Sequence, residues 1–288
     1  GNVLIGSVSR LYMSNKCLLI ADHKSVDKQI HIFNKNDFSY LTSIGNFGEG
    51  PEEITVMGCL AIDEAHHQLY VSDHAKQKIF SYDMDSVMVD SLYKPQVKTA
   101  MNETLFPSEY QYINDTLSIA ELIKPTSTST FNQFLGRWNM NTGEMIPMKY
   151  THPDIQKKRI TFAASEKAGI YVECYTRHDL MTICSLDGEL LYNIYGPDWD
   201  GGNGNKLQSF GTVMIGNDKI FVSYCGEDYA RDSFPTKILV FDLEGNYLKT
   251  LETGYKISDC CYDSFNNRII LSLNDVVQFA YLDIDGII

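Results

Sequence analysis

The sequence predicts an all-β fold, a six-bladed β-propeller with four antiparallel strands in each blade. Two observations predict it. Short apolar runs recur along the 288 residues, and each follows a tight polar turn. No apolar stripe with the spacing of a helix extends over ten or more residues. Short antiparallel strands repeated at a fixed period are typical of a propeller, which leaves only short strand edges.

The repeat is anchored on Leu69-Tyr70-Val71, the second strand of its unit. Measured from the first residue of each anchor, the spacings are 51, 48, 53, 50 and 49 residues. Such a period is the sequence signature of a repeat architecture. The other anchors are Leu18-Leu19-Ile20, Leu117-Ser118-Ile119, Ile170-Tyr171-Val172, Ile220-Phe221-Val222 and Ile269-Ile270-Leu271.

Turn residues complete each unit. A polar turn such as Asp63–Gln68 precedes each anchor and predicts a hairpin. Third strands end in turns such as Asp187-Gly188, and fourth strands close on a glycine such as Gly45 or Gly196. The predicted blades, within one domain of residues 1–288, are approximately 7–45, 58–93, 109–149, 159–196, 211–254 and 257–288 plus 2–6.

The N-terminus is expected to supply the missing strand of the last blade. The sixth unit ends after its third strand, at Gly286-Ile287-Ile288. Val3-Leu4-Ile5-Gly6 is similar to the fourth strands of other blades and ends on the same residue type. We therefore predict that Val3–Ile5 pairs onto the last blade and closes the ring.

Charge and cysteine usage exclude several classes of function. The net charge is −13, from 24 basic and 37 acidic residues. Nucleic acid and anionic membrane surfaces need a basic partner, so neither is expected to bind. The seven cysteines form no CxxC pair, which predicts neither a zinc site nor a disulfide framework and leaves at least one free thiol. No apolar run is long enough to span a membrane.

One unit also carries a family resemblance. Gly48-Glu49-Gly50-Pro51-Glu52-Glu53, Leu69–Asp73 and Lys78–Asp83 together resemble one NHL repeat. The whole chain resembles the exported, six-bladed, TolB-like propellers of Bacteroidetes, although only the second blade matches in detail. The resemblance implies export to the periplasm or the surface of the cell envelope, with a possible N-terminal lipid anchor outside this sequence. It implies no particular activity, because many such relatives have no assigned function.

Loop lengths predict where binding occurs. In a four-stranded blade, the loops after strands two and four lie on one face, which we call the long-loop face. The loops on the opposite face are short hairpin turns. Long loops on a rigid scaffold commonly carry function. The long loops are 22–28, 45–56, 94–108, 121–133, 148–158, 196–209 and 225–236.

Ten polar residues of the long-loop face are candidate binding residues. They could act as hydrogen-bond partners, acid–base groups or metal ligands. Alternatively, Asp22 and Asp73 could cap their own loops by accepting backbone N–H bonds, which is the interpretation we favour. The candidates are Asp22, His23, Asp73, His74, Glu173, Arg177, His178, Glu227, Asp228 and Arg231.

Asp198 and Asp200 are weak candidates for a calcium loop. Alternating oxygen ligands around a glycine are typical of short calcium loops. Gly202, however, stands where a ligand is expected, and Ser209 replaces the terminal Glu. We favour a connecting loop, and no cofactor is expected. No nucleophile elbow, P-loop or HExxH motif is present.

Two functional hypotheses are favoured over a third, a purely structural or assembly role, which the sequence neither supports nor excludes. The first is a non-catalytic exported propeller that binds a protein or glycan through the long-loop face. The alternative is a metal-dependent, calcium-type hydrolase or lyase with its site at the central channel. Carboxylates from different blades, such as Asp22, Asp73, Glu173 and Asp228, would then have to converge on one ion.

Overall fold

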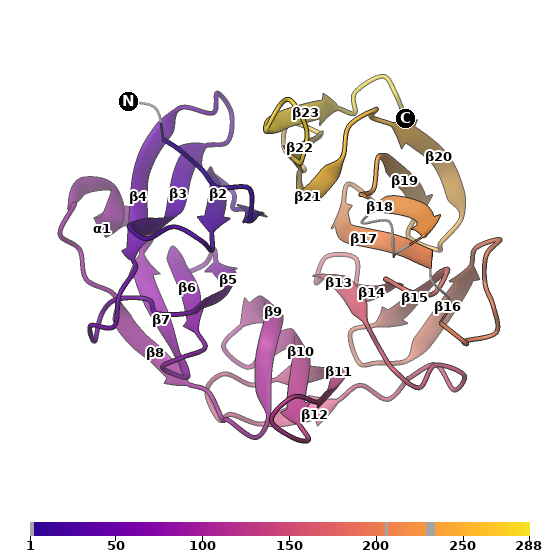
Figure 1. Cartoon of the computed structure of the whole chain (residues 1–288), viewed down its shortest axis with the longest axis horizontal. Helices are drawn as coiled ribbons and strands as arrows, with labels where there is room; N and C mark the ends of the chain where they lie inside the picture. Colours follow the sequence, from indigo (N-terminus) through magenta and orange to yellow (C-terminus); the bar gives the residue numbers. More distant parts are fainter. Residues whose placement is uncertain (1–2, 205–206, 229–233) are drawn as a thin grey trace. The chain divides into compact units, whose positions relative to one another are not determined.

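The computed structural model describes residues 3–204, 207–228 and 234–288, which form six small antiparallel sheets. Five of these sheets have four strands and one has three. In each sheet, strands adjacent in the chain lie side by side (Figure 1). All six apolar anchors lie in the second strand of a sheet. The predicted repeat of antiparallel strands is therefore confirmed.

The chain divides into two compact units. The first comprises residues 1–131 and 135–146, and the second comprises residues 132–134 and 147–288. The first unit holds two sheets and most of a third, and the second holds the remaining three. That the whole chain is one domain remains a prediction.

The N-terminal half of the chain forms three sheets. They run from β1 to β4, from β5 to β8 and from β9 to β12. Their strands are β1 (Ser9–Met13), β2 (Cys17–Asp22), β3 (Lys28–Asn34), β4 (Tyr40–Asn46), β5 (Met57–Asp63), β6 (Gln68–Asp73), β7 (Lys78–Asp83), β8 (Gln96–Ala100), β9 (Phe106–Asn114), β10 (Leu117–Pro125), β11 (Phe131–Trp138) and β12 (Met145–Pro147).

The other three sheets belong to the second unit. They run from β13 to β16, from β17 to β20 and from β21 to β23. Their strands are β13 (Ile160–Ser165), β14 (Ile170–Tyr175), β15 (Leu180–Ser185), β16 (Leu190–Tyr195), β17 (Leu207–Gly216), β18 (Lys219–Asp228), β19 (Lys237–Asp242), β20 (Tyr247–Glu252), β21 (Ile257–Asp263), β22 (Arg268–Leu273) and β23 (Phe279–Asp283).

Burial decreases from the second to the fourth strand of a sheet. Every residue of β2 and of β14 is buried, whereas β16 and β20 are mostly exposed. A strand that is covered on both faces has a nearly continuous apolar sequence. A strand that is covered on one face has polar residues among the apolar ones. This difference explains why the second strands gave the clearest repeat.

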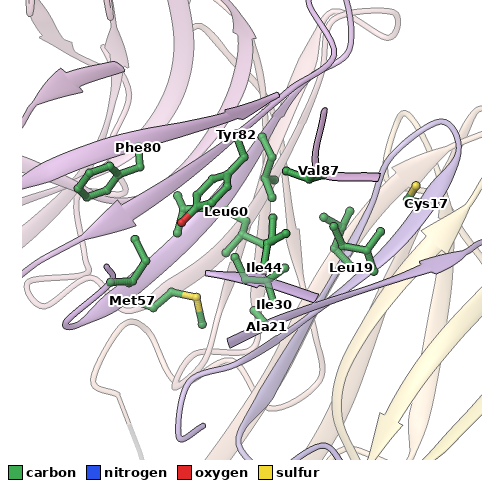
Figure 2. Packing of buried hydrophobic residues seen from close by; sticks show 14 residues of the cluster. Cys17, Leu19, Ala21, Ile30, Ile44, Met57, Leu60, Phe80, Tyr82 and Val87 are labelled. Carbon is green, nitrogen blue, oxygen red and sulfur yellow. The ribbon is translucent and has the colours of Figure 1, made fainter. Parts of the chain in front are cut away.

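Apolar side chains of the first two sheets pack against one another. Figure 2 shows this cluster, in which Leu19 and Ile30 of the first sheet join Leu60 and Phe80 of the second. Each of these four side chains is at most 2% exposed. Full burial of a side chain of this size contributes about 1.5–3 kcal/mol. Adjacent sheets of this unit are therefore held together by side-chain packing.

The second sheet extends beyond its predicted end at residue 93. A six-residue helix, α1 (Met84–Val89), follows β7 and leads to the fourth strand, β8. Asp83 caps this helix by accepting a hydrogen bond from the Ser86 N–H at 2.9 Å. A helix this short cannot show the apolar stripe on which the sequence analysis relied. The blade boundary at 93 was wrong for this reason.

The expected closing strand remains a prediction. Residues 3–6 are not in a strand, and the last sheet has three strands, β21 to β23. The predicted pairing would join the first unit to the second. Within the first unit, the Gly6 N–H donates a hydrogen bond of 2.8 Å to Asp22 Oδ2.

All seven cysteines are buried and free of disulfide bonds. Burial raises the pKa of the Cys59 thiol to about 12 and that of Cys184 to about 11. Within the described ranges, no helix is both long and apolar enough to cross a membrane.

Candidate functional site

The candidate site is a cavity of about 630 Å³ in the second unit, which we call the cationic cavity. Three segments line it, and each follows the second or fourth strand of a sheet. The first segment lies between β12 and β13, the second follows β14 and the third follows β16. The lining residues are Asp154, Gln156, Lys157, Arg159, Thr176, Arg177, His178, Gly202, Asn203 and Gly204.

The loop after β16 is fixed against the loop before β13 by close backbone contact. Gly202 has a φ of +92°, in the left-handed region that favours glycine. A Cβ at this position would lie 2.3 Å from the Asp154 carbonyl oxygen. The Asp200 carboxylate accepts a hydrogen bond of 3.2 Å from the Gly202 N–H. The glycines considered for a calcium loop therefore shape one wall of the cavity.

The same loop is also fixed at its start. The Asp198 N–H donates to Asp179 Oδ2 at 2.9 Å, and the Tyr224 hydroxyl donates to Asp179 Oδ1 at 3.1 Å. Burial raises the pKa of Asp179, and these two hydrogen bonds only partly offset the effect. Gly196 lies so close to this carboxylate that a Cβ would be 2.1 Å from Asp179 Oδ2.

Positive charge predominates in the cationic cavity. Lys157, Arg159 and Arg177 line it, and Asp154 is the one carboxylate among its lining residues. The chain as a whole carries −13. An excess of positive charge in a concave site of an acidic protein raises the local concentration of anions.

His178 adds a neutral polar group to the cavity wall. Its side chain is 7% exposed and packs against Tyr175 and Trp199, with ring centroids 5.8 and 6.1 Å away. Burial lowers the pKa of His178; Asp200 acts in the opposite direction and His152 adds to the decrease. The imidazole is thus uncharged at neutral pH. Its buried Nδ1 has no hydrogen-bond partner among the described residues.

Asp73 is a structural residue of its loop. It is fully buried, and its carboxylate accepts hydrogen bonds from the Thr55 and Val56 N–H groups at 2.8 and 3.1 Å. The Ala75 and Lys76 N–H groups also donate to it, at 3.0 and 3.3 Å, and Lys76 Nζ forms an ion pair with it at 3.3 Å. Burial raises the pKa of Asp73, but these donors together outweigh it and lower the pKa below its usual value. These hydrogen bonds are the ones expected of an aspartate that caps its own loop.

Asp22 makes a similar capping contact in the neighbouring sheet. It is 4% exposed and accepts hydrogen bonds from the Gly6 and Lys24 N–H groups, at 2.8 and 3.2 Å. His23 Nε2 lies 3.2 Å from the Gly58 carbonyl oxygen. The His74 ring packs 5.8 Å from that of Phe106, and burial lowers the pKa of His74. In the first unit these four candidates make packing and loop contacts.

Glu173 is buried in an ion pair. Its side chain is 2% exposed, Lys158 Nζ lies 2.8 Å from its carboxylate, and the Tyr175 hydroxyl donates to Oε2 at 3.2 Å. Burial and the neighbouring Glu173 raise the pKa of Tyr175 well above its usual value. The carboxylate of Glu173 thus lies beneath the loop surface.

Three candidates lie at the end of β18 or follow it in the sequence. The backbone of Glu227 and Asp228 belongs to β18, but the described part of the chain includes neither side chain. Arg231 lies outside the described residues.

No set of three His, Cys, Asp or Glu side chains within the described residues is arranged to hold a metal ion. Asp198 and Asp200, the weak calcium candidates, therefore have no third ligand of this kind in the described structure. Of the ten binding candidates, the structure places Arg177 and His178 at the cationic cavity.

The residues before β13 were not among the predicted binding residues. Asp154, Gln156, Lys157 and Arg159 line the cationic cavity, although only the length of their loop had been noted. Their signal was the basic run Lys157-Lys158-Arg159 directly before a strand of an acidic chain. Such a run is a charge pattern that can be found without coordinates.

A second cavity lies in the first unit, near the short hairpin turns. Its volume is about 500 Å³, and apolar residues including Leu19, Leu69 and Met88 line it together with His67 and Asp85. His67 Nδ1 and Asp85 Oδ2 are 3.1 Å apart. The face opposite the long loops therefore also has a cavity.

Comparison with known proteins agrees with this architecture. The sequence model of the DUF5128 family, described as a 6-bladed beta-propeller, matches residues 1–178. The chain belongs to this family. The six small sheets of this DUF5128 protein are the blades of an all-β propeller. No curated protein sequence matches it.

Several solved structures share the fold of this DUF5128 protein. One is described as an exported protein from Bacteroides fragilis, with a TM-score of 0.59 and 14% identity over 94% of this chain and 80% of that chain. A member of the DUF4221 family from Bacteroides vulgatus has a TM-score of 0.58 and 9% identity over 96% and 92%. The β-propeller domain of Cps50 (Swd1) from Myceliophteria thermophila has a TM-score of 0.60 and 10% identity over 98% and 97%. At these identities the similarity shows the fold alone.

Proposed function

We propose that this DUF5128 propeller is a non-catalytic, exported binding protein that takes a protein or glycan partner on its long-loop face. The observation that carries the proposal is the cationic cavity, which three segments after second and fourth strands enclose. Concave sites of 300–1,000 Å³ with a few convergent polar groups are typical of ligand binding.

The contacts of the candidate acid–base groups support a non-catalytic role. Asp22 and Asp73 accept backbone hydrogen bonds that fix their loops, and Glu173 is paired with Lys158. A catalytic carboxylate needs to reach a proton of the substrate. These three carboxylates instead have structural partners, and the cavity offers cationic and amide groups suited to recognition.

Export is the expected location. The family resemblance of the second blade implies it, and one structural neighbour is described as an exported protein from Bacteroides fragilis. An acidic surface suits a protein that must stay soluble among many neighbours.

Site-specific photo-crosslinking tests the proposal. A benzophenone amino acid replaces the exposed Gln156 at the cavity or, as a matched control, the exposed Lys167 in the turn between β13 and β14. Each protein is irradiated with an envelope extract of the cells that make it. We expect a saturable adduct from position 156 that excess unmodified protein suppresses, and none from position 167. Adducts from neither position, or equally from both, would contradict the proposal.

A thermal melt distinguishes this function from the metal-dependent alternative. A ligand that binds only the folded state raises its stability by mass action. We expect EDTA, Ca²⁺ and Zn²⁺ to leave the Tm unchanged. A Tm that EDTA lowers and one metal restores would favour the hydrolase or lyase instead.

A further inference from the structure

We infer that the cationic cavity binds an acidic saccharide, a sugar that carries a carboxylate or sulfate group. The inference rests on the proposed function, because it names the ligand chemistry of the same site. It follows from three properties of the cavity: the charge of its lining, its uncharged hydrogen-bonding groups and its size.

The charge of the lining selects an anion. Lys157, Arg159 and Arg177 come from two segments on either side of β13 and β14 and line one cavity. Guanidinium groups can bind a carboxylate or sulfate through two parallel N–H···O bonds, which fixes the orientation of the anion. The chain as a whole carries −13, so the positive lining of this cavity contrasts with the net charge. An anionic ligand is therefore directed to this cavity.

The uncharged groups suit sugar hydroxyls. Gln156, Thr176 and Asn203 line the same cavity and offer amide and hydroxyl groups, which both donate and accept hydrogen bonds. His178 contributes a buried ring whose Nδ1 has no partner among the described residues. A ligand with several hydroxyls matches this lining better than a bare inorganic anion does.

The size of the cavity fits one or two sugar rings. Its volume is about 630 Å³, within the usual range for small-molecule sites. The two loops that form its sides are held by the contact of Gly202 with Asp154, so the cavity is present before the ligand binds. A preformed site avoids part of the entropic cost of binding.

Calorimetric titration of the full chain tests the inference. The probes are a glucuronate-containing oligosaccharide, a sulfated oligosaccharide, a neutral oligosaccharide of equal length, a glutamate-rich peptide and inorganic sulfate. We expect the two acidic saccharides to bind and the neutral one not to. Raising the ionic strength from about 0.01 M to about 0.15 M shortens the screening length from about 30 Å to about 8 Å, which should weaken binding.

Two matched variants locate the binding. Arg177→Gln removes one exposed cation at the cavity, and Lys167→Gln removes one exposed cation from the turn between β13 and β14. Loss of a charge-assisted hydrogen bond should weaken binding by Arg177→Gln about tenfold or more, whereas Lys167→Gln should bind as the wild type does. The Tm of both variants verifies that they remain folded.

Each other outcome overturns the inference in an identifiable way. Equal binding of the neutral oligosaccharide, or unchanged affinity in Arg177→Gln, shows that charge at the cavity is not used. Binding of the acidic peptide or of sulfate in preference to the saccharides shows a different ligand. A saturable adduct at position 156 with a neutral partner would refute the inference and leave the proposed function intact. If no adduct forms at position 156 and no saccharide binds, both the inference and the proposed function fail.

Discussion

Single carboxylates decide local structure in this protein, and Asp73 is the clearest case. We expect Asp73→Asn to lower the free energy of unfolding by about 1.5–3 kcal/mol, since hydrogen bonds to a charged acceptor contribute about that much. The replaced carboxylate is fully buried and has several donors. Glu103→Gln, at an exposed position, is the control and should change little.

The pH dependence of stability supplies a second measure of Asp73. Its pKa is lowered in the folded state, so its contribution is present above the unfolded value of about 3.9 and is lost as the pH falls through the folded pKa. Urea unfolding between about pH 2 and pH 6 should therefore show a shallower acid loss in Asp73→Asn than in the wild type. Parallel curves for the wild type and Asp73→Asn would show that folding does not lower the pKa of Asp73.

The His74 side chain leaves no room for a Cβ at position 58, which is a glycine. A Cβ at this position would lie 2.2 Å from His74 Nε2 and 3.1 Å from Ser72 Cβ. The His74 ring is held against Phe106, so it cannot move away without losing that contact. We expect Gly58→Ala to lower stability by about 1–3 kcal/mol, the usual cost of overpacking. The double variant Gly58→Ala with His74→Ala should recover part of it in thermal melts, and no recovery would locate the clash elsewhere.

Elements of this fold are joined by turns with recurring chemistry. In the hairpin between β5 and β6, Asp63 accepts hydrogen bonds from the Tyr70 hydroxyl at 2.8 Å and from the His66 N–H at 3.2 Å. In the hairpin between β21 and β22, Asp263 accepts from the Phe265 and Asn266 N–H groups, both at 3.1 Å. An aspartate at the end of a first strand thus closes its own turn.

Removing one of these aspartates should loosen one hairpin and spare the other. We expect Asp63→Ala to cost about 1–3 kcal/mol, because it leaves the buried Tyr70 hydroxyl and the His66 N–H without their acceptor. Hydrogen exchange should accelerate for amides of residues 63–68 and remain unchanged for residues 263–267. Equal acceleration in both hairpins would indicate a global loss of stability instead.

The strands could be predicted from the sequence, because a buried strand needs an unbroken apolar run and each run here lies between turn residues. The second strands were located in all six sheets on this basis. The strand β8 was missed because it is partly exposed and ends without glycine. The cationic cavity could be anticipated only as a region of long loops. Which side chains share it depends on how the loops before β13 and after β16 fold together, and loop length does not specify that.

The molecule as a whole should depend on its N-terminal residues. If Val3–Ile5 completes the last blade, deletion of residues 2–6 removes a strand and the connection between the chain ends. We expect a decrease in Tm of several degrees, since each kcal/mol corresponds to about 2–4 °C for chains of this size. Asp22→Asn, which weakens the contact with the Gly6 N–H, is the control and should lower the Tm less. An unchanged melt after the deletion would rule out the closing strand.

If the protein is exported as proposed, its seven buried thiols connect folding to its lifetime. While the chain is folded, burial shields each sulfur, so oxidants and disulfide exchange do not reach it. Once the chain opens in an oxidising compartment, an odd number of thiols can pair wrongly and prevent refolding. The rate of unfolding, more than the equilibrium stability, would then set how long an exported molecule survives. A reductant should make its thermal unfolding reversible where air oxidation does not.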